Sequence, residues 1–482
     1  QYVRRSLSSL SAGETEYIQQ RKDVVLGSLD RLNINCTVDS IPRIALMGSG
    51  GGQRAAVALL GSLQQMRQDD LLDTLLYLGG VSGSTWAMAL LYSDPQWSIN
   101  MEPVLSILSG SRPGFLKTLS WLQDRAKEDN FSLSEIWGLM TSVLFMNHLN
   151  LRHLSEEASQ YSTNPYPVYC AIEKQCLTSG TIEAQWFEIT PHEAGFTDLG
   201  LFVPTPFLGS RFQGGECIEQ KSEMDMVQLQ GVLSSALANE DTLEHMLPSW
   251  MNMTVNAHVA GDHLRVYYIL VTLLELFQRD LNVSIALTQL DELRSKIKES
   301  LHKTVIVESM SAEDLRKVLQ ERNLELVHSV ETWCQELNDT PFKTFAIWTM
   351  REVLPLMIKW EWGTTENFLH RYKDTEVPPC LHSGKMLHLM DAGLLINVPY
   401  PSFLGEKRDI DLLIAPEYSA GEMFETLSLA RVYAAKVKKP FPVIDPSVLE
   451  DKDWPKDFYV FPGEHDQPTI IFMPLFNRRN CK

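Results

Sequence analysis

A serine between small residues is the most promising reactive group in this sequence. The run Gly80-Val81-Ser82-Gly83-Ser84 follows an apolar stretch at 75–78 and precedes a helix-favouring stretch at 85–91. This order predicts a tight strand-to-helix turn, which holds the hydroxyl out while its small neighbours let a substrate carbonyl approach. Ser82 is therefore a candidate nucleophile, although the same residue types also suit an ordinary turn.

A glycine-rich loop lies upstream of this serine. Gly48-Ser49-Gly50-Gly51-Gly52-Gln53-Arg54-Ala55 separates an apolar strand at 44–47 from an apolar helical stretch at 56–63. A strand, a glycine loop and a helix in this order direct backbone N–H groups at an anion. The Gly-Lys-Ser/Thr ending of a nucleotide-binding loop is missing, so an oxyanion hole for acyl transfer fits better.

A carboxylate far downstream completes a possible constellation. Asp391 ends the apolar run Leu387-His388-Leu389-Met390 and is followed by Ala392 and Gly393. An acid at the end of a strand is well placed to enter an active site. Taken alone, it is more often an ordinary residue of a turn.

These three motifs, in this order, resemble the patatin-like superfamily and, more closely, the cytosolic (group IV) phospholipase A2 family. The matching stretches are 48–55, 80–86 and the run Asp391-Ala392-Gly393-Leu394-Leu395-Ile396-Asn397-Val398-Pro399-Tyr400-Pro401. Similar stretches at 187–191, 362–365 and 440–446 extend the resemblance over nearly the whole chain. Within the family, the sequence looks most like the delta-type enzyme and its beta, epsilon and zeta relatives.

The resemblance implies a serine–aspartate dyad. Ser82 would attack an ester carbonyl and form an acyl-serine, and Asp391 would take the hydroxyl proton. The backbone N–H groups of Gly51 and Gly52 would stabilise the oxyanion. An aspartate with its ordinary pKa of about 3.9 is a weak base, so burial beside Ser82 would have to raise its pKa.

Two arginines are expected to bind the substrate phosphate. Arg54 begins the helix after the glycine loop, and Arg408 matches a second arginine of the family near the site. A guanidinium can bind two phosphate oxygens at once. The alternative for both is a structural ion pair, for which Asp409 is the obvious partner of Arg408.

A catalytic triad is the main alternative to the dyad. The order Ser82, Asp391, His465 is that of an α/β-hydrolase. His465, however, lies in the polar run Gly463-Glu464-His465-Asp466, which is typical of an exposed loop. The dyad is therefore the preferred interpretation.

The implied activity is hydrolysis of the sn-2 ester of membrane glycerophospholipids, which releases a fatty acid and a lysophospholipid. Phospholipase A1 or lysophospholipase activity would use the same site. The alternatives are a phospholipid N- or O-acyltransferase with the same acyl-enzyme, and a non-catalytic lipid-binding scaffold. Calcium regulation would come through the family's N-terminal C2 domain, which this chain does not show. No cofactor or metal site is expected within the chain itself.

The resemblance also implies the fold. We expect one α/β catalytic domain over residues 1–482, three-layered and patatin-like, with a central mixed sheet. The glycine loop and nucleophile turn fall in 41–92, a helical cap or lid is inserted at roughly 130–350, and the acid segment occupies 380–482. Apolar stretches at 136–154 and 264–277 predict helices of the cap.

Composition sets the remaining expectations. The chain has 482 residues, 44% of them hydrophobic, and a net charge of −19, which argues against nucleic acid as a partner. The seven cysteines form no CxxC pair, so free thiols in a reducing cytosol are expected. No signal peptide is visible. The expected protein is cytosolic, moves to membranes as a peripheral protein and needs no obligate protein partner.

Overall fold

The computed structural model describes residues 2–159, 162–239, 347–419, 421–477 and 479, together with the single residues 332, 335 and 343. The chain divides into two compact units. The first comprises residues 1–114, 134–236 and 362–482, and the second comprises 115–133 and 237–361. All of the predicted site residues belong to the first unit.

The first unit is built on a mixed sheet. Its strands follow the order β1-β7-β6-β5-β4-β3-β2-β12-β14-β13, and β10 and β11 join it at β4. The neighbouring strands β4, β3, β2, β12 and β14 are parallel to one another. Strands β4, β5, β6 and β7 pair antiparallel. The strand bounds are β1 Arg4–Arg5, β2 Ile44–Gly48, β3 Tyr77–Gly80, β4 Tyr166–Glu173, β5 Trp186–Ile189, β6 Glu193–Phe196, β7 Leu201–Pro204, β8 Arg211–Gln213, β9 Glu216–Glu219, β10 Thr364–Glu366, β11 Met386–Asp391, β12 Leu412–Glu417, β13 Tyr459–Phe461 and β14 Thr469–Pro474.

Helices of the first unit connect the strands of this sheet, and the second unit contributes two further described helices. Their bounds are α1 Ala12–Arg31, α2 Gln53–Gln68, α3 Gly83–Leu91, α4 Glu102–Leu108, α6 Leu133–Met140, α7 Lys174–Ser179, α8 Met226–Leu233, α15 Pro379–His382, α16 Tyr400–Phe403 and α17 Glu425–Val437, with α5 Phe115–Arg125 and α14 Leu354–Lys359 in the second unit. Every residue of α3 is buried, and the apolar positions of α2 join the same core. The predicted α/β class and mixed sheet are confirmed.

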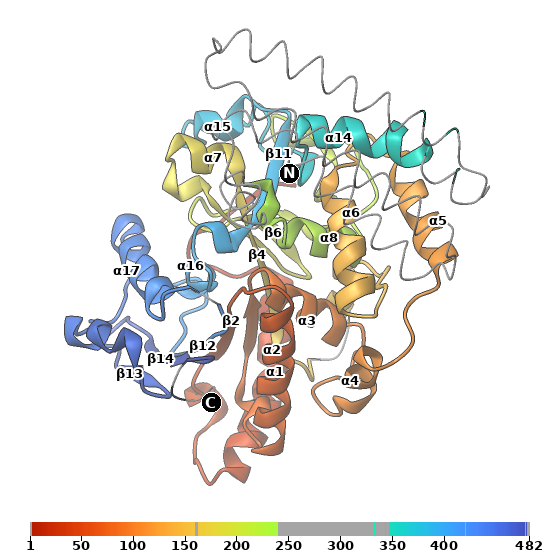
Figure 1. Ribbon diagram of the computed structural model, residues 1–482. Helices are drawn as coiled ribbons and strands as arrows, with labels where there is room; N and C mark the ends of the chain where they lie inside the picture. The colour runs from red at the N-terminus through yellow and green to blue at the C-terminus, as the bar shows by residue number, and fades with distance from the viewer. Residues whose placement is uncertain are drawn as a thin grey trace, which may run out of the picture. The chain divides into compact units, whose positions relative to one another are not determined.

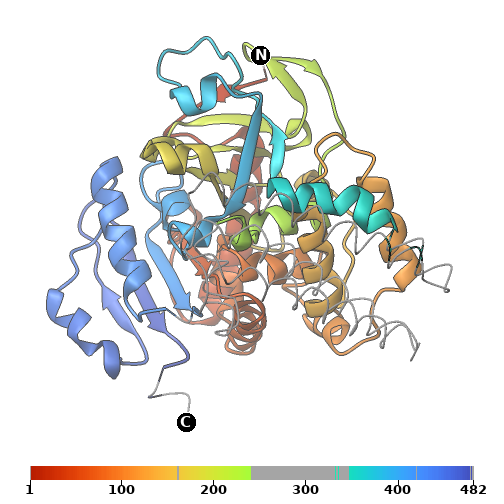
Figure 2. The ribbon, with the colours of Figure 1, turned by 45° about the horizontal axis from the view of Figure 1, so that its top comes forward.

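Helix α17 lies beside β12, β13 and β14 in both views (Figures 1 and 2). Just before the helix begins, the Phe424 ring packs against the rings of Tyr459 and Phe472, with centroids 5.3 and 5.8 Å apart. Because β14 is parallel to β12 and antiparallel to β13, the chain reaches the amino end of β12 through β13 and enters β14 from there. The hairpin of β13 and β14 then closes the sheet on this side.

The register of β4 decides where the predicted nucleophile and acid lie. On one edge, β4 pairs with β5, and on the other edge it pairs first with β3 and then with β11. Gly80, which ends β3, lies opposite Tyr169, and Asp391, which ends β11, lies opposite Ala171. Because β11 is antiparallel to β4, the carboxyl ends of β3 and β11 meet head to head.

The predicted cap is only partly described. The stretch expected to be helical over 136–154 forms the end of α6 followed by a π-helix, Thr141–Phe145, and all of it belongs to the first unit. The Phe145 ring stacks on the Trp86 ring of α3, with centroids 5.5 Å apart. The other predicted cap helix, at 264–277, lies outside the described residues.

A buried ionic network joins distant parts of the first unit. The guanidinium of Arg408 donates to Glu14 of α1, to Glu188 of β5 and to the Ser402 carbonyl. Lys407 bonds to Glu188 at 2.6 Å and lies 3.6 Å from the Phe202 ring centroid. Burial acts to raise the pKa of Glu188, but the two cations outweigh it and hold that pKa well below its usual range.

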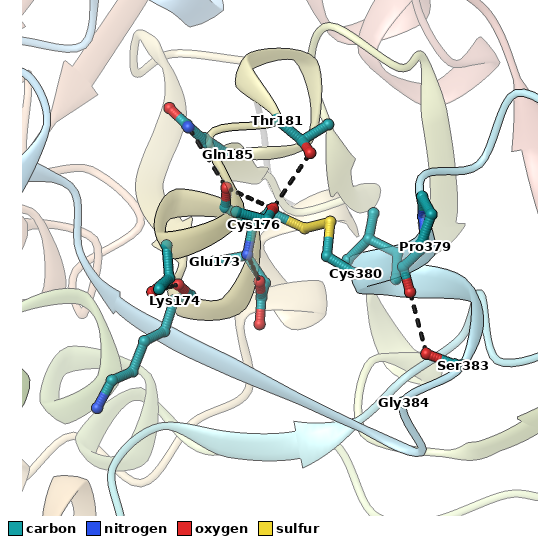
Figure 3. Close-up of a disulfide and its surroundings, with 12 residues drawn as sticks. Glu173, Lys174, Cys176, Thr181, Gln185, Pro379, Cys380, Ser383 and Gly384 are labelled. Atoms are coloured by element: carbon teal, nitrogen blue, oxygen red, sulfur yellow. Dashed lines mark hydrogen bonds between the residues drawn. A yellow bond between two sulfur atoms is a disulfide. The ribbon is translucent and has the colours of Figure 1, made fainter.

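A disulfide between Cys176 and Cys380 contradicts the expectation of free thiols throughout. It connects α7, which follows β4, to α15, which precedes β11, and its Cα atoms are 5.5 Å apart (Figure 3). The cysteines are 204 residues apart in sequence, and only the pairing of β4 with β11 brings them together. Cys36, Cys170 and Cys217 are free, and Cys334 and Cys481 lie outside the described residues.

We expect Arg408→Ala to destabilise the protein by about 3–5 kcal/mol, because it leaves Glu14 and Glu188 buried without their main partner. The control is Arg43→Ala, which removes only an exposed ion pair with Asp409 and should cost no more than about 1 kcal/mol. Thermal unfolding followed by circular dichroism measures both. Equal midpoints for the two variants would contradict the assigned role of the network.

Candidate active site

Ser82 stands at the turn between β3 and α3, as predicted. Its backbone is held at φ 52° and ψ −123°, a conformation that is rare for a residue with a side chain. Its carbonyl accepts the Thr85 N–H at 2.9 Å, and the Val81 N–H donates to the Gly48 carbonyl at 3.2 Å. Strain of this kind is typical of a functional site, where the surrounding structure holds it in place.

The glycine loop crosses directly over this turn. The Gly52 carbonyl lies so close to Gly83 that any Cβ at position 83 would overlap with it. Gly51 and Gly52 have φ values of 144° and 63°, which L-residues with side chains rarely adopt. Sequence patterns alone therefore located a turn in which the glycines are sterically required.

The amides of this loop are available to a ligand. In the described part of the chain, the N–H groups of Gly51 and Gly52 donate to no acceptor, whereas the Gly50 N–H donates to the Asn397 carbonyl at 2.9 Å. Gly52 is the N-cap of α2, and Ser82 is the N-cap of α3. The N-termini of α2 and α3 thus lie beside the same space, and their partial positive charge favours an anion there.

The loop is fixed in position from β12. The Tyr418 N–H, just past the end of that strand, donates to Ser49 Oγ at 2.6 Å, and the Tyr418 hydroxyl bonds to Ser62 Oγ at 2.9 Å. Ser84 Oγ donates to the Ser49 carbonyl at 2.6 Å and links the loop to α3. The roles of Tyr418 and Ser49 are not visible in the sequence, because these contacts depend on the pairing of β2 with β12.

Asp391 is buried at the end of β11 and adjoins Ser82. Burial raises the pKa of its carboxyl to about 6, while the neighbouring Ser82 side chain and a hydrogen bond from the Gly393 N–H, at 2.8 Å, act to lower it. A carboxylate with a pKa near neutrality is a more effective general base than an ordinary aspartate. Such a shift in a residue next to a candidate nucleophile supports assignment of this site.

Arg54 is exposed beside the loop, and its position agrees with a ligand-binding role. Its Nε donates to the Tyr418 carbonyl at 2.8 Å, and its guanidinium lies 6.0 Å from the centroid of the Phe476 ring. No carboxylate of the described residues forms an ion pair with it. The terminal nitrogens therefore remain available for a phosphate.

Arg408 does not belong to this site, contrary to expectation. Its side chain is fully buried, and all five of its N–H donors are used, by Glu14, Glu188 and the Ser402 carbonyl. Its guanidinium lies over the Tyr77 ring, at the end of β3 away from Ser82. Nor is Asp409 its partner, since Asp409 pairs with Arg43. No donor of Arg408 is left for a phosphate.

His465 is remote from Ser82. It is exposed in the turn between β13 and β14, where it has a φ of 55°. Because β14 is parallel to β12, this turn lies at the amino ends of the parallel strands, opposite the end that carries the glycine loop. The topology therefore favours the dyad over the triad.

A cavity of about 430 Å³ in the first unit lies away from Ser82. It is lined by residues that include Asp198, Ser402, Lys407 and Lys439. Lys439 pairs with Asp198 at 2.6 Å, and Lys407 is engaged by Glu188. These cations are already neutralised by acids of the protein, so the cavity does not compete with Ser82 as a site for chemistry.

Comparisons with known proteins agree with this geometry. The family model for the lysophospholipase catalytic domain matches residues 120–264. Human cytosolic phospholipase A2 gamma is 32% identical over 98% of this chain and 86% of its own length, and the mouse gamma protein is 29% identical over 98% and 83%. Human cytosolic phospholipase A2 zeta is 30% identical, but the match spans only 53% of its length.

A solved structure shares the fold. Human GIVD cytosolic phospholipase A2 matches 98% of this chain and 59% of its own, with a TM-score of 0.66 and 22% identity. The chain therefore belongs to the cytosolic phospholipase A2 family and carries a phospholipase catalytic domain. Among these relatives, human gamma is 32% identical, human zeta 30% and human delta 24%, so the chain is more similar in sequence to gamma and zeta than to delta.

We expect activity to rise with pH through an apparent pKa near 6, because Asp391 must be deprotonated to accept the Ser82 proton. The measurement is kcat/KM on a soluble ester from about pH 4.5 to 8. Circular dichroism across the same range verifies that the fold persists. A profile that stays flat down to the lowest pH would show that no carboxyl with a raised pKa acts in the reaction.

Proposed function

We propose that this protein is a phospholipase A2 that hydrolyses the sn-2 ester of membrane glycerophospholipids through a Ser82–Asp391 dyad. One observation carries the proposal. A serine on a strained strand-to-helix turn adjoins a buried carboxyl with a pKa of about 6, beneath two glycine amides that donate to no acceptor in the described part of the chain. The membership of a phospholipase family supports the choice of substrate class.

The first half-reaction forms an acyl-enzyme. Ser82 Oγ attacks the ester carbonyl while its proton passes to Asp391. The carbonyl oxygen becomes an oxyanion, which the N–H groups of Gly51 and Gly52 stabilise by roughly 3 kcal/mol each. When the tetrahedral intermediate collapses, the ester C–O bond breaks, and Asp391 returns the proton to the leaving lysophospholipid.

The second half-reaction regenerates the enzyme. Asp391 takes a proton from water, whose oxygen attacks the acyl-serine through the same oxyanion hole. The bond to Ser82 breaks, Ser82 recovers the proton, and the fatty acid leaves. An alcohol or amine acceptor in place of water would make the protein an acyltransferase. No contact of the described residues favours such an acceptor, so hydrolysis is the proposal.

Membrane contact is part of this proposal. Val57, on the exposed face of α2 one turn after Arg54, is 53% exposed, and Phe476 beside Arg54 is 44% exposed. Apolar side chains around a phosphate-binding arginine suit a lipid surface. No helix of the described residues is both long and apolar enough to span a bilayer. The proposed protein is therefore a peripheral one, working in the cytosol as the family name implies.

Calcium enters only as a separate proposal. In the described part of the chain, no three His, Cys, Asp or Glu side chains form a cluster that could bind a metal ion. The proposed calcium regulation acts through the C2 domain that the family resemblance implies, and no step above involves the ion. Sedimentation of the protein with vesicles in calcium or in EDTA tests this part.

We expect Ser82→Ala and Asp391→Asn each to lose at least about 10³-fold in kcat, because both residues act in bond formation. His465→Ala, the matched control for the triad, should remain within about threefold of the wild type. The assay follows fatty acid and lysophospholipid released from mixed vesicles. An inactive His465 variant would replace the dyad by the triad, an active Asp391 variant would exclude both, and an active Ser82 variant would exclude the proposed mechanism.

We expect Arg54→Lys to lower turnover of phospholipids about 10- to 100-fold, because an ammonium cannot hold two phosphate oxygens in the guanidinium geometry. An uncharged ester should be affected much less. The control is Arg67→Lys, on the same helix but bonded to the Ile99 carbonyl at 2.7 Å. Equal losses on both substrates would assign Arg54 to the support of the glycine loop through Tyr418.

A further inference from the structure

We propose that Asn397 is a positioning residue that sets the separation between the oxyanion loop and Asp391. The inference deepens the proposed function and depends on it. Asn397 follows Asp391 by six residues and lies between the 3₁₀ turn Ala392–Leu394 and α16. It contacts both halves of the site, which come from opposite ends of the chain.

The backbone of Asn397 holds the glycine loop. Its carbonyl accepts the Gly50 N–H at 2.9 Å, which is the contact that distinguishes Gly50 from the two glycines after it. The loop would otherwise be free to rotate a third amide towards the substrate. The bond therefore fixes which amides face Ser82.

The side chain of Asn397 fills the space between the loop and the acid. A Cβ placed on Gly50 would overlap with Asn397 Oδ1 and would lie 2.9 Å from Ser82 Cβ. A Cβ placed on Gly393 would lie 2.6 Å from Asn397 Oδ1 and 3.0 Å from Asp391 Oδ1. The carboxamide thus packs against both glycines, next to the nucleophile on one side and next to the acid on the other.

The charge of this side chain matters because Asp391 is buried. The neighbours that set the ionisation of Asp391 are Ser82 and the Gly393 N–H, and no charged group of the described residues is among them. The acidic and basic side chains on β4 and β11 are Glu173 and His388, and burial raises the pKa of Tyr166, Tyr169 and Cys170 of β4 and so favours their neutral forms. The Glu173 carboxylate accepts the backbone N–H groups of Cys176 and His388. A second carboxylate at position 397 would disfavour the ionised form of Asp391.

The test compares Asn397→Asp and Asn397→Ala with the wild type. Its readout is the rate at which a fluorophosphonate labels Ser82, measured against pH, with Ser82→Ala as the blank. We expect Asn397→Asp to move the acid limb upward by about one pH unit. We expect Asn397→Ala to keep the limb in place but to label about 10- to 100-fold more slowly, because the loop and the acid lose their spacing. The matched control, Asn33→Asp, adds the same charge at an exposed turn after α1 and should behave as wild type.

The outcomes separate the inference from the function on which it rests. If Asn397→Asp is folded and keeps the wild-type limb, Asn397 does not face Asp391 and the inference fails. If Asn397→Asp does not fold, Asn397→Ala decides, and labelling at the wild-type rate in that variant overturns the inference. A purely structural role would lower the unfolding temperature of both variants without moving the limb. If Ser82→Ala is still labelled, it is the proposed function that fails.

Discussion

The head-to-head meeting of β3 and β11 on one edge of β4 is the constraint on which the rest of this site depends. The two strands run in opposite directions and end opposite Tyr169 and Ala171 of β4. Ser82 and Asp391 therefore meet although they are far apart in sequence. The disulfide between α7 and α15 holds the far end of the same strand pair. A slip in this register would move Asp391 to the other face of the sheet.

Two electrostatic effects act where β3 and β11 meet: burial acts on Asp391, and backbone dipoles act on the oxyanion. Burial raises the pKa of Asp391 to about 6 and so makes it a usable base. Two helices, α2 and α3, begin beside the same space and present N–H groups to an oxyanion. The acid gains basicity from burial, while the oxyanion gains stability from fixed dipoles that need no counter-ion. Tyr418 and Asn397 hold the glycine loop that carries these N–H groups in position.

Arg54 and Arg408 show how surroundings decide the role of identical side chains. Among the described residues, Arg54 contacts acceptors only through its Nε, which donates to the Tyr418 carbonyl, and its side chain is exposed. Arg408 is fully buried and uses all five donors, because a buried guanidinium must be matched by acids and carbonyls. Glu14 and Glu188, which neutralise it, come from α1 and β5. The same network that removes Arg408 from the site fastens the N-terminal helix to the sheet.

The sequence by itself determined the local parts of the protein. The turns at 48–55 and 80–84 and the strand ending at Asp391 were predictable, because each depends on neighbours only a few residues away. The tertiary structure decided which of these parts cooperate. The burial of Arg408, the Cys176–Cys380 disulfide and the contacts of Tyr418 and Asn397 all depend on strands that pair across long stretches of chain. A side chain's partners are set by such pairings, and residue types in sequence do not reveal them.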